Sequence, residues 1–168
     1  MNMYRLPVSA IVLMTAMLAL LSACGFHLQT RAELPTEMQQ TRLEIQGPYS
    51  RFAQRLETLL EQNGVNVVKS GDQAATLEVP LNRTRKQIQS IGDDARVREY
   101  LITHTVHFRL LDSDGKEMIP LQIFEQSRVY SFNEQDILAA EREDEFLRND
   151  LSDSLAGMVV RRLGTYGK

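Results

Sequence analysis

The chain has 168 residues, which is enough for one domain and too few for two well-formed ones. Hydrophobic residues make up 43% and charged residues 24%, a globular balance that excludes a wholly disordered chain. The formal net charge of −3 argues against a nucleic-acid partner, because neutralising phosphates normally requires a basic surplus. A single cysteine excludes an internal disulfide and a cysteine-based zinc site.

The amino-terminal segment has the layout of a secretory signal. Arg5 precedes an uncharged apolar run, residues 6–21, which is shorter than the roughly 20 residues that a membrane-spanning helix needs. The run ends in Leu21-Ser22-Ala23-Cys24, which resembles the lipobox of bacterial lipoproteins. This resemblance implies that residues 1–23 are a signal peptide and that Cys24 becomes the acylated amino terminus. The alternative is a plain signal peptide followed by a free thiol.

Acylation of Cys24 would anchor the protein by lipid alone. Each buried acyl methylene contributes about 0.8 kcal/mol, so two or three chains hold a protein at a membrane essentially permanently. The next residue is Gly25 rather than an aspartate. Within the sorting rule that the lipoprotein resemblance brings in, this favours the outer membrane of a Gram-negative cell.

The segment after the cysteine divides into a tether and a folded domain. Residues 24–40 contain Pro35 and few apolar side chains, so they are expected to form the tether. Residues 41–168 are expected to form one domain. Within it, residues 41–46 alternate in polarity and predict a first short strand.

A helix is expected next, because Ser50 can cap its start and Asn63-Gly64 can stop it. Its apolar positions follow the spacing of a core-facing surface helix and are Phe52, Leu56, Leu59 and Leu60.

Three extended segments follow. The first, residues 75–82, contains Pro80, which indicates an edge strand or a bulge. Residues 100–110 form the longest clean alternation and predict a strand that a turn at residues 112–115 connects to its neighbour. The return strand begins with its apolar side chains at odd positions and then switches parity, which predicts a bulge near Glu125.

From about Asp136 the pattern becomes helical again, with an apolar stripe that ends at Gly164. The predicted order is therefore β-α-β-β-β-α. We expect an α+β two-layer sandwich in which two helices pack on a four-stranded, largely antiparallel sheet.

The start of the expected mature chain, Cys24-Gly25-Phe26-His27-Leu28, is similar to that of LptE, the lipopolysaccharide-assembly lipoprotein family. The element order, the helix stop at Asn63-Gly64 and the Glu99-Tyr100 entry to the long strand fit as well. The resemblance implies a non-enzymatic protein that plugs the lumen of the β-barrel LptD at the outer membrane. It also implies direct binding of lipopolysaccharide and help in placing it in the outer leaflet.

Five basic residues lie close together in this acidic chain: Arg83, Arg85, Lys86, Arg96 and Arg98. Guanidinium groups bind phosphates through paired donors, so these residues are the candidates for contact with a phosphorylated glycolipid. Arg83 and Arg85 continue the parity of the preceding apolar residues, which predicts that the core face of the strand becomes basic. The alternative is a solvated hairpin tip that charge keeps soluble.

Phe124, Tyr130 and Phe132, near the expected parity switch, are the aromatic candidates for contact with the barrel. The acidic residues between Glu141 and Asp150 are more often a solvated helix start, although they could face a basic wall. His104 is expected to be a hydrogen-bonded core histidine. It cannot share a metal with His107, which points to the opposite face of the strand.

The sequence contains no recognisable set of nucleophile, base and acid, and Gly-x-Ser-x-Gly is absent. This argues against a hydrolase. Together with what the resemblance implies, it leads us to expect no enzymatic activity, cofactor or metal. A rival hypothesis is a freestanding outer-membrane lipoprotein that binds or chaperones a periplasmic ligand without a barrel partner.

Overall fold

The structure is a computed structural model that describes residues 33–71 and 73–166. The expected signal peptide, the candidate acylation site Cys24 and most of the expected tether lie outside the described residues. The elements in chain order are η1 (Thr36–Gln39), β1 (Gln40–Ile45), α2 (Arg51–Gln62), β2 (Asn66–Val68), β3 (Ala75–Ile91), β4 (Val97–Leu111), β5 (Glu117–Ser131), η2 (Glu134–Asp136) and α3 (Ile137–Leu163). In the described part of the chain, no helix has the length and apolar character needed to cross a membrane.

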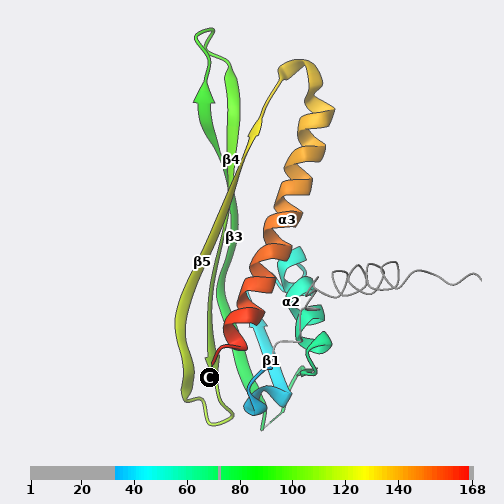
Figure 1. Ribbon diagram of the computed structural model, residues 1–168, viewed down its shortest axis with the longest axis vertical. Helices are drawn as coiled ribbons and strands as arrows, with labels where there is room; N and C mark the ends of the chain where they lie inside the picture. The colour runs from blue at the N-terminus through cyan, green and yellow to red at the C-terminus, as the bar shows by residue number, and fades with distance from the viewer. Residues whose placement is uncertain (1–32, 72, 167–168) are drawn as a thin grey trace, which may run out of the picture. The chain divides into compact units, whose positions relative to one another are not determined.

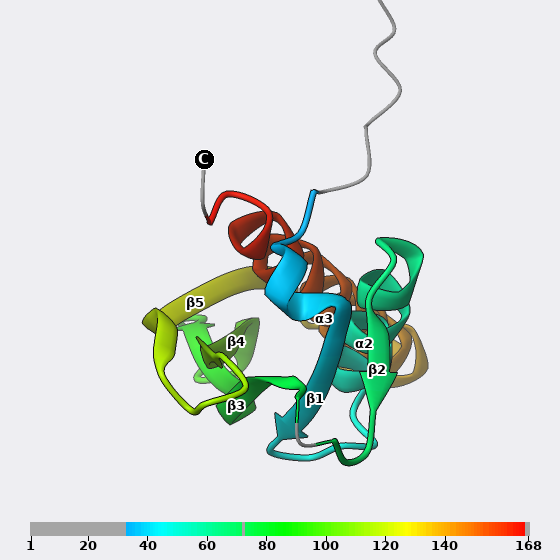
Figure 2. The same ribbon diagram turned by 90° about the horizontal axis from the view of Figure 1, so that it is seen from below.

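The expected α+β class is confirmed, with α2 and α3 on the same face of one sheet (Figure 1, Figure 2). The predicted number of strands and their largely antiparallel pairing need correction. The sheet has five strands in the order β2-β1-β3-β4-β5, and β1 pairs in parallel with both β2 and β3. The overlooked strand, β2, has only three residues, too few to show an alternating pattern.

Local sequence explains where α2 begins and ends. The Ser50 side chain accepts a hydrogen bond from the Ala53 amide at 3.2 Å and so caps the first turn. Gly64 follows the helix with φ +91°, a conformation that side chains disfavour. The predicted stripe faces the sheet, with Phe52, Leu56 and Leu60 fully buried.

The core begins earlier in the chain than expected. Met38 lies in the expected tether, residues 24–40, but it is fully buried in the main hydrophobic cluster. Its carbonyl also accepts a hydrogen bond from the buried Thr41 hydroxyl at 2.8 Å. The folded part therefore includes η1, so residues 36–40 belong to the domain rather than to the expected tether.

A second, smaller cluster lies under the amino-terminal half of α3. It contains Ile102, Tyr130, Ala140 and Leu151, with Tyr100, Phe132 and Leu147 packed around it. The main cluster instead joins α2 and the carboxyl-terminal half of α3 to β1, β3 and β4. One long helix therefore covers both clusters.

The bulge that Pro80 indicated is present, and it changes which residues face the helices. Glu78 pairs with Arg109 but Leu81 pairs with His107, so β3 has one extra residue between them. From Asn82 to Ile88, where the next irregularity begins, the even residues of β3 face the helices. The prediction that Arg83 and Arg85 continue the core face is therefore wrong, because the bulge turns both to the opposite face.

The parity switch in β5 occurs earlier than predicted. Ile119 pairs with Leu110 and Gln122 with Phe108, which places the extra residue before Gln122 instead of near Glu125. As a result, Leu121 and Ile123 are exposed rather than part of the core.

Candidate functional site: the distal ribbon

Beyond the end of β1, the sheet narrows to three strands. The last pairing of β1 with β3 joins Ile45 to Val79, and β3, β4 and β5 then continue together (Figure 1). We call this three-stranded part, residues 81–91, 97–107 and 123–131, the distal ribbon. Its inner face lies against α3, and its outer face points away from both helices. All five predicted basic residues lie in it or in the turn at its tip.

Lys86 is on the inner face, and its side chain, 34% exposed, is ion-paired to α3. Its ammonium group lies 2.7 Å from the Asp144 carboxylate on α3, and 4.3 Å and 5.2 Å from the ring centroids of Tyr100 and Tyr130. Asp144 also accepts hydrogen bonds from Arg148 and, at 3.1 Å, from the Tyr130 hydroxyl. The Lys86 charge is therefore already compensated inside the protein.

The contacts within this cluster favour the charged forms of both Asp144 and Lys86. Burial alone would raise the pKa of Asp144, but hydrogen bonds from Arg148 and Lys86 outweigh it and lower the pKa to about 2. Burial also opposes the charge on Lys86, yet its contacts with Asp144 and Tyr130 raise its pKa. Asp144 is consequently charged at any physiological pH.

Asp144 belongs to the acidic run that predicts a solvated helix start, but in the structure it contacts Lys86 and Tyr130 on the inner face. It lies seven residues before Leu151 and four before Arg148, so helical spacing places all three on one side of α3. That spacing is the signal that could have found it. The neighbouring Glu141, Glu143 and Glu145 are exposed, as predicted for a solvated helix start.

Arg83 and Arg85 are exposed on the outer face. Neither has an ion-pair or hydrogen-bond partner among the residues that the structure describes. Their strand partners in β4 are Thr105 and Thr103.

Arg96 and Arg98 lie at the tip, where the chain turns from β3 into β4. Asp94 is 2.8 Å from Arg98 and 3.9 Å from Arg96, and Glu134 is 3.3 Å from Arg96. All four side chains are about half exposed. The five basic residues thus occupy three separate environments: the inner face, the outer face and the tip. The outer-face Arg85 is six residues of extended chain, or about 20 Å, from Ile91 at the tip, so the outer-face and tip arginines form separate groups.

The three aromatic candidates for barrel contact point inward rather than outward. Tyr130 is only 3% exposed and packs in the second cluster, with Tyr100 at a ring-centroid distance of 5.8 Å. Phe132 packs against Tyr100, and Phe124 packs against Phe108 in the main core. Tyr130 is therefore a core residue of the isolated chain, because its neighbours leave almost none of its surface for a partner.

His104 is buried, as predicted, within a polar network that joins three elements. Its Nε2 lies 2.8 Å from the Asn82 Oδ1, and the Asn82 amide donates to the Ser50 hydroxyl that caps α2. Its Nδ1 lies 3.3 Å from the Ser152 hydroxyl on α3. Burial lowers the pKa of His104 to about 4, so the imidazole is neutral at pH 7.

The order Ser152, His104, Asn82 resembles the arrangement of a nucleophile, a base and an orienting group. The Ser152 hydroxyl, however, donates to the Arg148 carbonyl at 2.8 Å, and Ser152 is only 7% exposed. Its single proton is therefore directed away from the imidazole, and the network connects helices to the sheet. Among the described residues, no group of three or more His, Cys, Asp or Glu side chains is placed to hold a metal ion.

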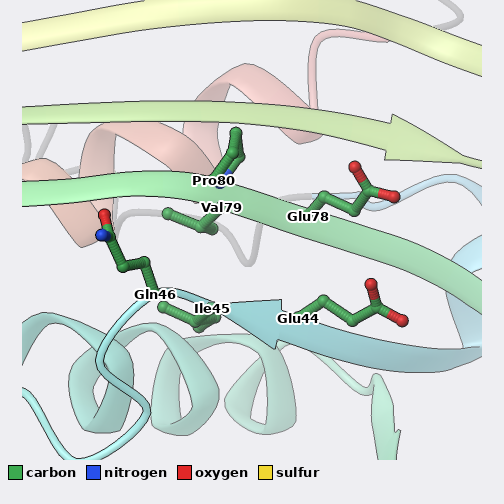
Figure 3. Close-up of a pocket in the computed structure, with 6 residues that line it drawn as sticks. All are labelled: Glu44, Ile45, Gln46, Glu78, Val79 and Pro80. Atoms are coloured by element: carbon green, nitrogen blue, oxygen red, sulfur yellow. The ribbon is translucent and has the colours of Figure 1, made fainter.

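Two depressions of about 430 Å³ border the ribbon. The first lies where β1 leaves the sheet beside Pro80, and Figure 3 shows the carboxylates of Glu44 and Glu78 side by side on neighbouring strands. Each of these is compensated, by Arg42 at 3.0 Å and Arg109 at 2.6 Å. The second depression lies over the Asp144 cluster, between the inner face and α3.

Comparison with known proteins agrees with this architecture. The family model LptE, described as lipopolysaccharide-assembly, matches residues 38–163. LPS-assembly lipoprotein LptE from Yersinia pestis (strain Pestoides F) is 28% identical over 150 residues, which cover 86% of this chain and 70% of that protein. The protein of the same name from Yersinia pseudotuberculosis serotype O:1b (strain IP 31758) matches to the same extent.

Solved structures show the same fold. The solution structure of an uncharacterized lipoprotein B from Nitrosomonas europaea has a TM-score of 0.71 at 23% identity, covering 84% of this chain and 92% of its own. A minor lipoprotein from Acinetobacter baumannii has a TM-score of 0.66 at 22% identity, covering 77% and 93%. Because the family model spans three-quarters of the sequence, from η1 to the end of α3, the chain belongs to the LptE family of lipopolysaccharide-assembly lipoproteins.

Proposed function

We propose that this protein is an outer-membrane lipoprotein, anchored through acylated Cys24 on the periplasmic side. It plugs the lumen of an LptD-like β-barrel, supports the assembly of that barrel, binds lipopolysaccharide and assists its insertion into the outer leaflet. It acts by binding and not by catalysis. The observation that carries this proposal is the match of the LptE family model to residues 38–163. The relatives named LPS-assembly lipoprotein support it.

The tip of the distal ribbon is the best-supported site for the glycolipid. Arg96 and Arg98 offer guanidinium groups that are half exposed and only partly compensated by Asp94 and Glu134. Ile91, which pairs with Val97 between these two arginines, is 61% exposed, and Ile88, which pairs with Tyr100, is 53% exposed. These residues give apolar surface near the charges. Phosphates and acyl chains of an amphipathic ligand require this combination. Lys86 is less suited, because Asp144 already compensates it.

Two measurements on the full chain test the proposal. The first is co-purification with the LptD-like barrel of the same organism from detergent-solubilised outer membranes, where we expect a stable complex. The second is lipopolysaccharide binding at low salt, which should weaken as salt rises because counterions screen exposed charges. Migration of the wild type without a barrel would contradict the plug and support the freestanding lipoprotein instead.

Charge reversal at the tip tests the glycolipid site. Arg96→Asp with Arg98→Asp should weaken lipopolysaccharide binding at least tenfold, or about 1.4 kcal/mol, while leaving the barrel complex intact. Lys69→Asp with Lys116→Asp is the matched control, because it changes the net charge equally at exposed positions remote from the ribbon. If the tip variant and the wild type bind lipopolysaccharide equally well, the tip is not the glycolipid site.

A further inference from the structure

We propose that the outer face of the distal ribbon is the surface that meets the barrel wall. It fits a protein surface that places carboxylates opposite Arg83 and Arg85 and apolar side chains opposite Ile123 and Val129. This inference rests on the proposed function and deepens it, because that function names a barrel partner without naming the contact surface.

Strand pairing sorts the outer face into rows of three residues. Residues directly opposite each other on antiparallel strands share a face, so the register identifies each row. From the bulge towards the tip the rows are Leu81–His107–Ile123, Arg83–Thr105–Glu125, Arg85–Thr103–Ser127 and Gln87–Leu101–Val129. Apolar residues therefore flank a polar centre on both sides.

The charges of this face are compensated near β1 but not in the ribbon. Near β1, Arg42 pairs with Glu44 and Arg109 pairs with Glu78. Arg83 and Arg85, about 7 Å apart along the strand, have no ion pair among the described residues. Two adjacent uncompensated guanidinium groups are complementary to carboxylates supplied from outside the chain.

The aliphatic side chains at both ends of the polar centre are exposed. Ile123 is 61% exposed and Val129 is 50% exposed, on a sheet face that α2 and α3 do not cover (Figure 2). A one-sided antiparallel sheet is expected to carry polar side chains on its solvent face. The exposed aliphatic side chains depart from that expectation and supply the apolar part of a protein interface, which combines apolar and polar side chains in about the proportion of ordinary surface.

The sign pattern favours a protein over a lipid surface. Glu125 lies in the same row as Arg83, two strands away, and its carboxylate accepts a hydrogen bond from Thr105 at 2.8 Å. Two strand spacings separate the cation from the anion by about 10 Å. A layer of anionic phosphates would attract Arg83 but repel Glu125. A protein wall can oppose each with the complementary charge.

The test uses the full chain, co-expressed with the LptD-like barrel of the same organism. Arg83→Asp with Arg85→Asp should reduce co-purified barrel at least tenfold, while lipopolysaccharide binding and the thermal unfolding midpoint stay at the wild-type values. The matched double variants Arg96→Asp with Arg98→Asp, and Lys69→Asp with Lys116→Asp, carry the same change in net charge. Both should retain the barrel.

The failures of the two proposals are distinguishable. If the wild type binds the barrel and Arg83→Asp with Arg85→Asp binds it equally well, the outer face is not the contact surface and the proposed function stands. If the wild type itself does not bind the barrel, the proposed function fails. Lost lipopolysaccharide binding with an intact barrel complex would assign Arg83 and Arg85 to lipid phosphates and overturn the inference.

A crosslinking measurement covers the case in which charge reversal disturbs folding. A photoreactive phenylalanine analogue at Val129 leaves both arginines in place and should crosslink to the barrel at least fivefold more strongly than the same analogue at Glu44. Glu44 is an exposed residue of β1 on the same face of the sheet, outside the distal ribbon. Equal crosslinking at both positions, or a crosslink from Val129 to a second copy of this chain, would overturn the inference.

Discussion

The Lys86 ammonium group lies 2.7 Å from the Asp144 carboxylate, so a single ion pair joins the distal part of β3 to the amino-terminal half of α3. Tyr130 on β5 donates to the same carboxylate. The cluster therefore ties two strands of the ribbon to one position on the helix. The sheet has only three strands at this point, because β1 and β2 have ended. The contacts of Asp144 with Lys86 and Tyr130 therefore hold α3 against the inner face of the distal ribbon.

Removing the Asp144 charge should destabilise the fold. Asp144→Asn leaves Lys86 and Arg148 without their shared anion, and we expect a loss of about 2 kcal/mol in the free energy of unfolding. Asp150→Asn is the control, because the Asp150–Arg128 pair is 3.4 Å apart and both side chains are more than 40% exposed, against 15% for Asp144. It should cost less than about 1 kcal/mol. Urea unfolding followed by circular dichroism checks both, and equal losses would contradict a special role for Asp144.

Stability should fall as the pH drops from about 6.5 to 4. Burial lowers the pKa of His104 from 6.5 to about 4, so within this window the unfolded chain binds a proton that the folded chain excludes. The contribution is fully present above pH 6.5 and amounts to roughly 3 kcal/mol. The Asp144 contribution is lost at lower pH, between 3.8 and about 2. Urea unfolding across this range should show a flatter profile for His104→Gln than for the wild type between pH 6.5 and 4.

Tyr130 should behave as a core residue. Tyr130→Asp places a second carboxylate beside Asp144 in a buried cluster. We therefore expect the free energy of unfolding of the isolated protein to fall by more than about 3 kcal/mol. Tyr130→Phe keeps the ring and removes only the 3.1 Å hydrogen bond to Asp144. It should cost about 1.5 kcal/mol. A native thermal unfolding midpoint for Tyr130→Asp would show that the ring is not required by the core.

Cys24→Ala should abolish lipid attachment and processing at this position, because the thiol is the only one in the chain. Mass spectrometry of the membrane fraction should find an acylated Cys24 in the wild type and an uncleaved, unacylated variant. The described fold should be unaffected, since its core begins at Met38. An unmodified Cys24 in the mature wild type would refute the lipid anchor.

Several features could be predicted from the sequence because they depend on local rules. Ser50 and Asn63-Gly64 bound α2 as expected, since a cap and a left-handed stop act within one turn. The alternation in β4 predicted its buried face correctly from Ile102 to Leu110. The family resemblance likewise rested on a contiguous motif beginning at Cys24.

Only the tertiary structure decided which side chains share an environment. One extra residue before Leu81 inverts the face of β3 as far as Ile88, and another before Gln122 does the same for the rest of β5. Periodicity alone does not fix where such a bulge falls. Arg85 and Lys86 are adjacent in sequence and therefore face opposite sides of β3. The bulge decides which side each one faces, so Lys86 pairs with Asp144, 58 residues later, and Arg85 stays exposed and uncompensated. The sequence therefore determined the family, the caps and most of the core. Long-range strand pairing and the path of α3 decided which charges remain free to meet a partner.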